Sequence, residues 1–511
     1  MYNYIPRLVL RAVLCTLCSL VHAEVALPAI FGDHMVLQRQ QTNPVWGTAD
    51  PGESVIVKIH GQHHTTTANA NGDWRIMLNP LPTGGPYEMM IEATNTITLR
   101  DILSGEVWLC SGQSNMVRSV NSTYHADVEL LSANYPSIRI ISVPNVAAQE
   151  PQNDFEGQWE ACTPKTVANF SAVGYVFGRR LHNTLGVPIG LIDNAWGGSS
   201  AEAWVPRETL EADEAYHPML AKWDKTATDY TDEIHAAAME KFQEWQQAGQ
   251  PEPLQRAPQD PRQGQKRPAN LYNGVLHPVL GYGIRGSIWY QGEGNSARAY
   301  QYRDLFPLMI NTWRERWGIG DFPFYWVQLA DYRAEEPTPG DSNWAELREA
   351  QTMTLSLPNT GEAVIIDTGE ARDIHPRDKH TVANRLVRHA LAKDYGYNIA
   401  SESPRYQSMQ AEDGAITITL EHVSKGGLFA FDVAEVQGFA IAGEDRTFVW
   451  AQAEIVGHNQ IKVSSPDVPY PVAVRYGWAD NPVLNLRDLN GLPVTPFRTD
   501  DWPGVTAGKV K

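Results

Sequence analysis

The chain has 511 residues, enough for about three domains of ~150 residues each. Hydrophobic residues make up 42% of it, and it contains sixteen tryptophans, which excludes an intrinsically disordered chain. The net charge of −18 argues against nucleic acid or an anionic membrane surface as a partner.

The N-terminus is typical of a secretory signal peptide over residues 1–23. Arg7 and Arg11 form its positive flank, the stretch from Leu8 to Val21 is largely apolar, and Val21-His22-Ala23 is a small-residue cleavage site. We therefore expect the mature chain to be secreted or periplasmic. Beyond the signal no apolar run approaches the ~20 residues needed to span a bilayer, so we expect no transmembrane segment after cleavage.

Two of the four cysteines are lost with the signal, and Cys110 and Cys162 remain. They could form a disulfide outside the cytoplasm, but Cys110 lies in an apolar strand, which favours two free buried thiols. No cluster of cysteine and histidine has the spacing of metal ligands. We therefore expect no metal and no cofactor.

Residues 24–100 are predicted to be all-β. Short alternating runs, such as 54–59 and 87–93, are separated by turn clusters such as Asp50-Pro51-Gly52. Strands at this spacing indicate a small β-sandwich domain, for which packing or display is the expected role. The sequence offers no candidate for chemistry in this part.

The pattern changes from about residue 101 to 400, where strands alternate with helices. We expect strands at 107–110, 138–143, 189–194, 286–290, 324–329 and 363–366, and helices at 171–185, around 308–317, at 345–355 and around 382–391. This alternation predicts an α/β domain, with a parallel sheet covered by helices on both faces. Ligands of such sheets bind at the carboxyl ends of the strands.

Residues 206–270 interrupt the alternation. They hold one polar helical run at 229–247 and then a stretch rich in proline and glutamine at 249–268. We interpret this segment as an insertion over the sheet, either a lid or a solvated surface excursion. Residues 401–511 return to β-structure, with alternating runs at 415–420 and 460–463, and form either a second sandwich or strands that complete the first.

Four motifs follow predicted strands of the α/β domain. In the first, G-E-V-W-L-C-S-G-Q-S-N-M at 105–116, an apolar strand runs into a small-residue turn that carries Ser114. Hydrolases present a nucleophilic serine in this way. The turn lacks the second glycine of G-x-S-x-G, however, and a serine in a glycine turn can also be only a turn residue.

The second motif, N-A-W-G-G-S-S at 194–200, is a glycine turn after a strand. Backbone N–H groups at Gly197 and Gly198 could point at one oxyanion, or the turn could be a plain strand–helix connection. The third motif, W-Y-Q-G-E-G-N at 289–295, places an amide and a carboxylate after a strand. Gln291 could donate to an oxyanion and Glu293 could orient a histidine, or both could belong to a capped loop.

The fourth motif is Asp373-Ile374-His375-Pro376. Proline holds the preceding residue extended, and residues two apart in an extended segment point the same way, which puts Asp373 beside His375. Acyl transfer through an acyl-enzyme requires a serine, a histidine, a carboxylate and donors for an oxyanion. The four motifs place all of these at the strand ends of one sheet.

Together these motifs, which span about residues 105–395, resemble those of the sialate O-acetylesterase group of carbohydrate esterases, within the SGNH hydrolase superfamily. The resemblance implies an SGNH-type parallel sheet flanked by β-sandwich regions. It also implies that Ser114 is the nucleophile and His375 the general base. The implied oxyanion hole consists of the Ser114 N–H, the N–H of Gly198 or Gly197, and the Gln291 side chain.

One departure leaves the identity of the acid open. General SGNH enzymes carry Asp-x-x-His, whereas here Asp373 is two residues before His375 and Arg372 is three before. In some related acetylxylan esterases the glutamate of a Gln-Gly-Glu motif takes the role of the acid instead. By this resemblance Glu293 is the rival of Asp373. We favour Asp373.

The sequence therefore predicts a serine esterase that removes O-acetyl groups from acetylated mono- or oligosaccharides, either sialic acid or plant and marine glycans. Trp196, Trp204 and Tyr290 are candidate sugar-stacking walls, although each could instead belong to the core. Asn295 is a further candidate substrate contact. The alternatives are a lipase or arylesterase acting on non-sugar esters, and a non-catalytic carbohydrate-binding protein.

Overall fold

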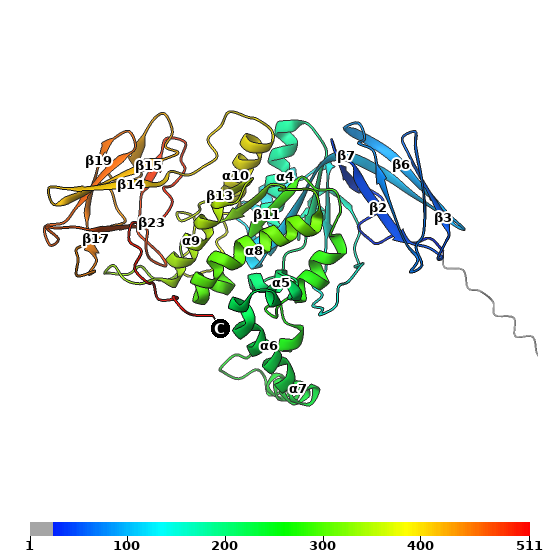
Figure 1. The fold of residues 1–511 in the computed structure, drawn as a ribbon, viewed down its shortest axis with the longest axis horizontal. Helices are drawn as coiled ribbons and strands as arrows, with labels where there is room; N and C mark the ends of the chain where they lie inside the picture. Colours follow the sequence, from blue (N-terminus) through cyan, green and yellow to red (C-terminus); the bar gives the residue numbers. More distant parts are fainter. Residues whose placement is uncertain (1–23, 511) are drawn as a thin grey trace, which may run out of the picture.

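The structure is a computed structural model that describes residues 24–510, so the predicted signal peptide lies outside the described residues. A β-sandwich, a central α/β unit and a second β-sandwich follow one another along the longest axis of the molecule (Figure 1). The predicted α/β class with flanking β-rich regions is confirmed. Within residues 24–510 no helix combines the length and apolar character that crossing a membrane requires.

The N-terminal sandwich alternates buried and exposed residues along its strands, as a half-buried sheet does. Strand β2 pairs with β5, while β3 pairs with β4 and β6, and β6 pairs with β7. The strands are β1 (Val36–Gln38), β2 (Asn43–Thr48), β3 (Ser54–Ile59), β4 (Gln62–Thr67), β5 (Asp73–Leu78), β6 (Gly84–Glu92) and β7 (Thr96–Gly112).

Strand β7 belongs to two parts of the molecule at once. Its first half pairs with β6 and β1, and its second half lies between β10 and β11 of the central sheet. Every residue from Ile102 to Gly112 is buried, because a strand covered on both faces is apolar almost throughout. The sandwich boundary that we expected near residue 100 therefore falls inside one continuous strand.

The central sheet has the order β13-β12-β11-β7-β10-β8-β9. All of these strands are parallel except β9, which pairs antiparallel with β8. Their bounds are β8 (Tyr135–Ser142), β9 (Glu160–Cys162), β10 (Ile189–Asp193), β11 (Gly286–Tyr290), β12 (Phe324–Val327) and β13 (Thr360–Ala363). The strand expected at 363–366 thus ends at Ala363, and the apolar residues after it are buried outside the ladder.

Helices cover both faces of this sheet, as predicted. On one face α4 and α10 pack with the side chains of Trp108 and Cys110 of β7. On the other face α8 and α9 pack with Leu109 of β7 and Trp289 of β11. The helices of the central unit are α1 (Ser114–Val117), α2 (Ala126–Ser132), α3 (Pro164–Val167), α4 (Ala172–Leu185), α8 (Ala299–Trp317), α9 (Asn343–Met353) and α10 (Lys379–His389).

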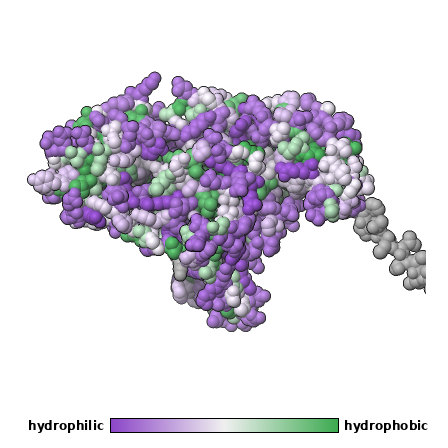
Figure 2. Space-filling model, in the orientation of Figure 1, coloured by the Kyte–Doolittle hydropathy of each residue, from purple (hydrophilic) through white to green (hydrophobic). Residues whose placement is uncertain are grey.

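The insertion contains three helices, α5 (Arg207–Glu211), α6 (His217–Asp229) and α7 (Asp232–Gln247). Helices α6 and α7 project from the body of the molecule (Figure 1), and their surface is largely hydrophilic (Figure 2). No residue of α7 is buried. The sequence predicted only the α7 run, because α6 buries just Met219 and Leu220 and so carries no long apolar stripe.

The C-terminal part forms a second sandwich. Its two four-stranded sheets, β14-β15-β20-β19 and β18-β17-β21-β23, share one hydrophobic core, and among the described residues none of their strands pairs with the first sandwich. The strands are β14 (Arg405–Glu412), β15 (Ala415–Glu421), β16 (Leu428–Ala430), β17 (Phe439–Ala442), β18 (Val449–Trp450), β19 (Gln452–Gly457), β20 (Gln460–Ser464), β21 (Ala473–Tyr476), β22 (Leu486–Asp488) and β23 (Phe497–Arg498).

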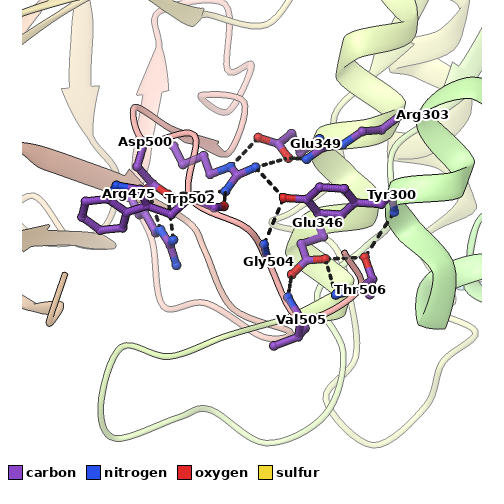
Figure 3. Close-up of polar contacts among 11 residues, drawn as sticks. Tyr300, Arg303, Glu346, Glu349, Arg475, Asp500, Trp502, Gly504, Val505 and Thr506 are labelled. Carbon is purple, nitrogen blue, oxygen red and sulfur yellow. Dashed lines mark hydrogen bonds and ion pairs between the residues drawn. The ribbon is translucent and has the colours of Figure 1, made fainter. Parts of the chain in front are cut away.

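After β23 the chain crosses back onto α8 and α9 (Figure 3). The buried carboxylate of Glu346, on α9, accepts hydrogen bonds from the Val505 N–H at 2.6 Å and the Thr506 N–H at 3.0 Å, and also from the Thr506 hydroxyl. The Tyr300 hydroxyl, on α8, accepts from the Gly504 N–H at 2.9 Å. This segment therefore ties the second sandwich to the central unit.

We expect Glu346→Ala to lower the free energy of unfolding by about 3 kcal/mol, because it leaves buried donors of the crossing segment without an acceptor. Urea-induced unfolding and limited proteolysis of residues 499–510 measure the effect. Glu444→Ala, at an exposed position, is the control and should change neither. An unchanged urea midpoint in Glu346→Ala would show that the segment adds no stability.

Candidate active site

Ser114 follows β7 at the carboxyl edge of the sheet. The turn before it depends on Gly112, whose φ of 131° favours glycine. A Cβ at Gly112 would lie 2.3 Å from the Tyr290 carbonyl oxygen, so no other residue fits there. The Gln113 N–H donates to the same oxygen at 2.9 Å. The end of β11 thereby fixes the turn that presents Ser114.

The fourth motif lies directly beside this turn. Nε2 of His375 is 2.9 Å from Oγ of Ser114, although the two residues are 261 positions apart in the chain. Nδ1 of His375 is 3.4 Å from Oδ1 of Asp373, and the same oxygen accepts the His375 N–H at 2.9 Å. The structure thus aligns serine, histidine and aspartate as the sequence predicted.

The surroundings of His375 keep its imidazole neutral. Burial lowers the pKa of His375, Asp373 opposes this, and the positive charges of Arg118 and Lys379 lower the pKa further. The pKa of Asp373 is itself lowered, chiefly by the hydrogen bond from the His375 N–H. At neutral pH the site therefore holds a free imidazole next to an ionised carboxylate, which is the state that a general base needs.

Glu293, the rival acid, has other partners. Its carboxylate accepts hydrogen bonds from Nε2 of Gln113 at 2.6 Å and from Nδ2 of Asn115 at 2.7 Å, and burial raises the pKa of Glu293. Nδ1 of His375 faces Asp373 instead. The geometry therefore favours Asp373 over Glu293 as the group that orients the histidine.

Two residues that sequence analysis did not single out connect the motifs. Asn115 donates through Nδ2 to Glu293 and, at 3.0 Å, to the Ile374 carbonyl oxygen. Its Oδ1 accepts a hydrogen bond from Nζ of Lys379 at 2.6 Å. The sequence held one signal for Lys379, namely a cation at the start of a helix, where the helix dipole disfavours it.

The glycine turn of the second motif also meets the serine. The Trp196 N–H donates to the Gly112 carbonyl oxygen at 3.0 Å, and a Cβ at Gly197 would be 3.4 Å from Cβ of Ser114. Gly198 has a φ of 74°. Within residues 24–510 the N–H groups of Ser114, Gly197 and Gly198 donate no hydrogen bond, so all three are available to an oxyanion.

The predicted oxyanion role of Gln291 is corrected by the structure. Gln291 is fully buried, and its Nε2 donates to the Ser199 carbonyl oxygen at 3.1 Å and to Oδ1 of Asn295 at 2.7 Å. Its Oε1 accepts from the Tyr302 hydroxyl at 2.9 Å. Both amide hydrogens are thus committed, and Gln291 supports the glycine turn from within the core.

Three of the four predicted substrate contacts are also corrected. Asn295 is buried and donates to Glu202 at 2.8 Å. Trp204 is fully buried, edge to face with Trp289 at 5.7 Å between ring centroids. Tyr290 is fully buried at the end of β11. The two aromatic rings pack into the core, where large apolar side chains are most often found, and Asn295 is held there by its polar partners. Of the four residues only Trp196 is partly exposed.

The returning segment of the insertion, residues 262–270, forms a wall beside the glycine turn. Nε2 of Gln265 is 3.2 Å from the position that a Cβ on Gly198 would take. The Ala269 N–H donates to the Glu202 carbonyl oxygen at 3.2 Å, and Nδ2 of Asn270 donates to the Gly264 carbonyl oxygen at 2.9 Å. The insertion therefore reaches the site with this segment, while α6 and α7 point away.

Cys110 and Cys162 are both buried free thiols, in agreement with the interpretation that we favoured over a disulfide. Burial raises the pKa of each thiol, that of Cys162 to about 11. Neither is therefore a reactive thiolate at neutral pH.

Comparison with known proteins now decides the family. The family described as carbohydrate esterase, sialic acid-specific acetylesterase matches residues 104–252 and 262–395. The chain belongs to this family. Sialate O-acetylesterase of Mus musculus is 33% identical over 91% of this chain and 92% of its own length. That of Homo sapiens is 32% identical over 93% of each chain.

A solved structure agrees with this assignment. A carbohydrate acetylesterase from Xanthomonas citri superposes with a TM-score of 0.80 at 35% identity, covering 94% of this chain and 100% of the other. The family that the four motifs indicated is confirmed, and the chain is an esterase.

We expect kcat/KM to fall at acid pH with a midpoint below pH ~6.5, the usual pKa of histidine, because the surroundings lower the pKa of His375. Asp373→Asn should move this midpoint to still lower pH, since it removes the charge that raises the pKa, and should reduce kcat by roughly 10²–10⁴-fold. Hydrolysis rates between pH 4 and 9 measure both effects.

Glu293→Gln is the matched comparison, because it leaves Asp373 beside His375. Its loss of kcat should be smaller than that of Asp373→Asn. The reverse order of losses would make Glu293 the acid.

Proposed function

We propose that this chain is a serine esterase that removes O-acetyl groups from acetylated sugars through an acyl-enzyme, with Ser114 as nucleophile. The observation that carries the proposal is the alignment of Ser114, His375 and Asp373, at 2.9 Å and 3.4 Å, at the carboxyl edge of the sheet in a member of a carbohydrate esterase family. Sheets of this type bind their ligands at that edge.

In the first half of the reaction Oγ of Ser114 attacks the carbonyl carbon of the acetyl group. Nε2 of His375 takes the serine proton, and the carboxylate of Asp373 stabilises the imidazolium that forms. The oxyanion lies against the N–H groups of Ser114 and of Gly198 or Gly197, which donate to no acceptor in the part of the chain that the structure describes. Each such donor contributes roughly 10²–10³-fold to turnover.

In the second half His375 returns its proton to the departing sugar hydroxyl. Water then attacks the acetyl-serine ester, with His375 again taking a proton, and acetate leaves. The proton that Ser114 lost is restored in this step, so the enzyme is unchanged. No group beyond the described side chains and backbone amides is needed for these proton transfers.

The substrate follows from the relatives and from the walls of the site. The mammalian relatives are sialate O-acetylesterases, and the Xanthomonas citri protein is a carbohydrate acetylesterase. The half-buried Trp196 and Gln265 offer an aromatic face and an amide beside the glycine turn, which suit the apolar face and the hydroxyl groups of a sugar. Acetylated mono- or oligosaccharides, either sialic acid or plant and marine glycans, are the proposed substrates.

The aligned triad argues against a non-catalytic carbohydrate-binding protein, which has no use for a serine and a histidine at 2.9 Å. The polar walls argue against a lipase or arylesterase. The signal peptide expected at residues 1–23 makes the periplasm or the exterior of the cell the proposed site of action.

Acetate release from 9-O-acetyl sialic acid, acetylated xylan and acetylated xyloglucan tests the function. We expect release by the wild type and a loss of roughly 10⁴-fold or more in Ser114→Ala and in His375→Ala. Ser132→Ala, an exposed serine of α2, should retain full activity. Hydrolysis of p-nitrophenyl butyrate alone would indicate a non-sugar esterase, and sugar binding without any hydrolysis would indicate a binding protein.

The wall formed by the insertion makes a separate prediction. Gln265→Ala should raise KM for an acetylated sugar by about 3- to 10-fold, because it removes one hydrogen bond to the sugar. Hydrolysis of p-nitrophenyl acetate should be unchanged. Gln263→Ala, at an exposed position of the same segment, is the matched control. Equal KM values for the sugar in both variants would exclude Gln265 as a sugar contact.

A further inference from the structure

Lys379 occupies a position that no general rule of folding favours. It is the first residue of α10, where the helix dipole repels a cation, and its exposed fraction is 0%. Burying an ammonium group costs several kcal/mol unless close partners compensate it. A local conflict of this kind is characteristic of functional sites.

The partners of the Lys379 ammonium all belong to the site. Nζ donates to Oδ1 of Asn115 at 2.6 Å and lies 5.1 Å from the centroid of the Tyr290 ring, within range of a cation–π interaction. Burial lowers the pKa of Lys379 to about 7, and the negative charge of Glu293 opposes this fall and favours the ammonium form. Because a lysine ammonium can only donate, it fixes which end of the Asn115 amide faces it.

That orientation determines what the other end of the amide can do. With Oδ1 directed at Lys379, Nδ2 of Asn115 donates to Glu293 at 2.7 Å and to the Ile374 carbonyl oxygen at 3.0 Å. Asn115 follows Ser114 in the chain, and Ile374 precedes His375. The bond therefore ties the side chain of the residue after Ser114 to the backbone carbonyl of the residue before His375.

We propose that Lys379 is a positioning residue for deacetylation: its buried amino group donates to the Asn115 amide and orients it, and the amide in turn holds His375 at hydrogen-bonding distance from Ser114. The inference rests on the function proposed above. It gives Lys379 and Asn115 a role without placing either of them in contact with the substrate.

The ammonium also acts on His375 through its charge. The charged groups that influence Lys379 are Glu293 of the third motif, Arg118 after α1, and Asp373 and Asp378 of the loop before α10. Lys379 and Arg118 disfavour protonation of His375, and Asp373 favours it. Removing the ammonium should therefore raise the pKa of His375 and move the acid limb of the activity profile to higher pH.

Lys379→Met removes the charge and keeps the length of the side chain. We expect kcat to fall by about 10- to 100-fold on both an acetylated sugar and p-nitrophenyl acetate, since misplacement of a reacting group by ~1 Å costs up to about 10²-fold, with little change in KM. Lys393→Met is the matched control, because Nζ of Lys393 bonds the Thr360 carbonyl oxygen and Glu402 instead. Wild-type kcat in Lys379→Met would overturn the proposal.

A double-mutant cycle with Asn115→Ala tests whether the two residues act together. The combined variant should lose little more kcat than Asn115→Ala alone, because the lysine acts through the amide. Full multiplication of the two losses would show that Lys379 does not act through Asn115 and would overturn the proposal.

A titration that needs no turnover separates this inference from the proposed function. In the full chain labelled with ¹⁵N-histidine, the His375 signals are assigned by their absence in His375→Gln. The pKa of His375 should be higher in Lys379→Met than in the wild type and in Lys393→Met. An unchanged pKa would overturn the inferred action of the Lys379 charge on His375, whether or not an acetyl ester is hydrolysed. If the wild type hydrolyses no ester, the proposed function fails while this titration still decides the role of Lys379.

Discussion

Strand β7 is the element on which both the architecture and the site depend. Its buried residue Glu106 receives hydrogen bonds from Gln38 and Arg39 of the first sandwich and from Arg285, just before β11. The pKa of Glu106 stays below its ordinary value because Arg285 and Arg39 outweigh the effect of burial, which alone would raise it. A buried carboxylate with so many partners fixes the register of β7, and with it the position of the turn at its end.

The site itself is assembled from loops that have little structure of their own. Each loop is fixed at one end by a buried strand and at the other by polar contacts with its neighbours. Asn115 contacts the loops of Glu293 and Ile374, and Gln291 contacts the loop of Ser199. Ser114 and His375 are thus held close together by hydrogen bonds that are shielded from water, where such bonds are strongest.

The sequence predicted that Ser114, His375 and Asp373 lie together, because their signals are local. The apolar run before Ser114, the proline after His375 and the two-residue spacing to Asp373 all act within a few positions. The side chains of Gln291, Asn295, Trp204 and Tyr290 were misassigned, because a single sequence shows which residues lie near the end of a strand but not which of them pack into the core.

Long-range partners to which the four motifs assign no role could not be predicted. The contact between Lys379 and Asn115 joins residues 264 positions apart, and no pattern in a single sequence encodes such a pair. The continuity of β7 was missed for a related reason. Its alternating first half and its apolar second half have different periodicities, because one half is covered on one face and the other half on both.

The insertion carries an evolutionary consequence. Its two ends are pinned to the central unit, whereas α7 buries no residue and the pair α6–α7 stands clear of the body. Selection can lengthen, shorten or reshape α7 at little cost in stability, whereas the start of α6 buries Met219 and Leu220 in the core. The interruption of the family match between residues 252 and 262 falls just beyond α7. Under the proposed function, new specificity can arise through the returning segment while Ser114, His375 and Asp373 stay unchanged.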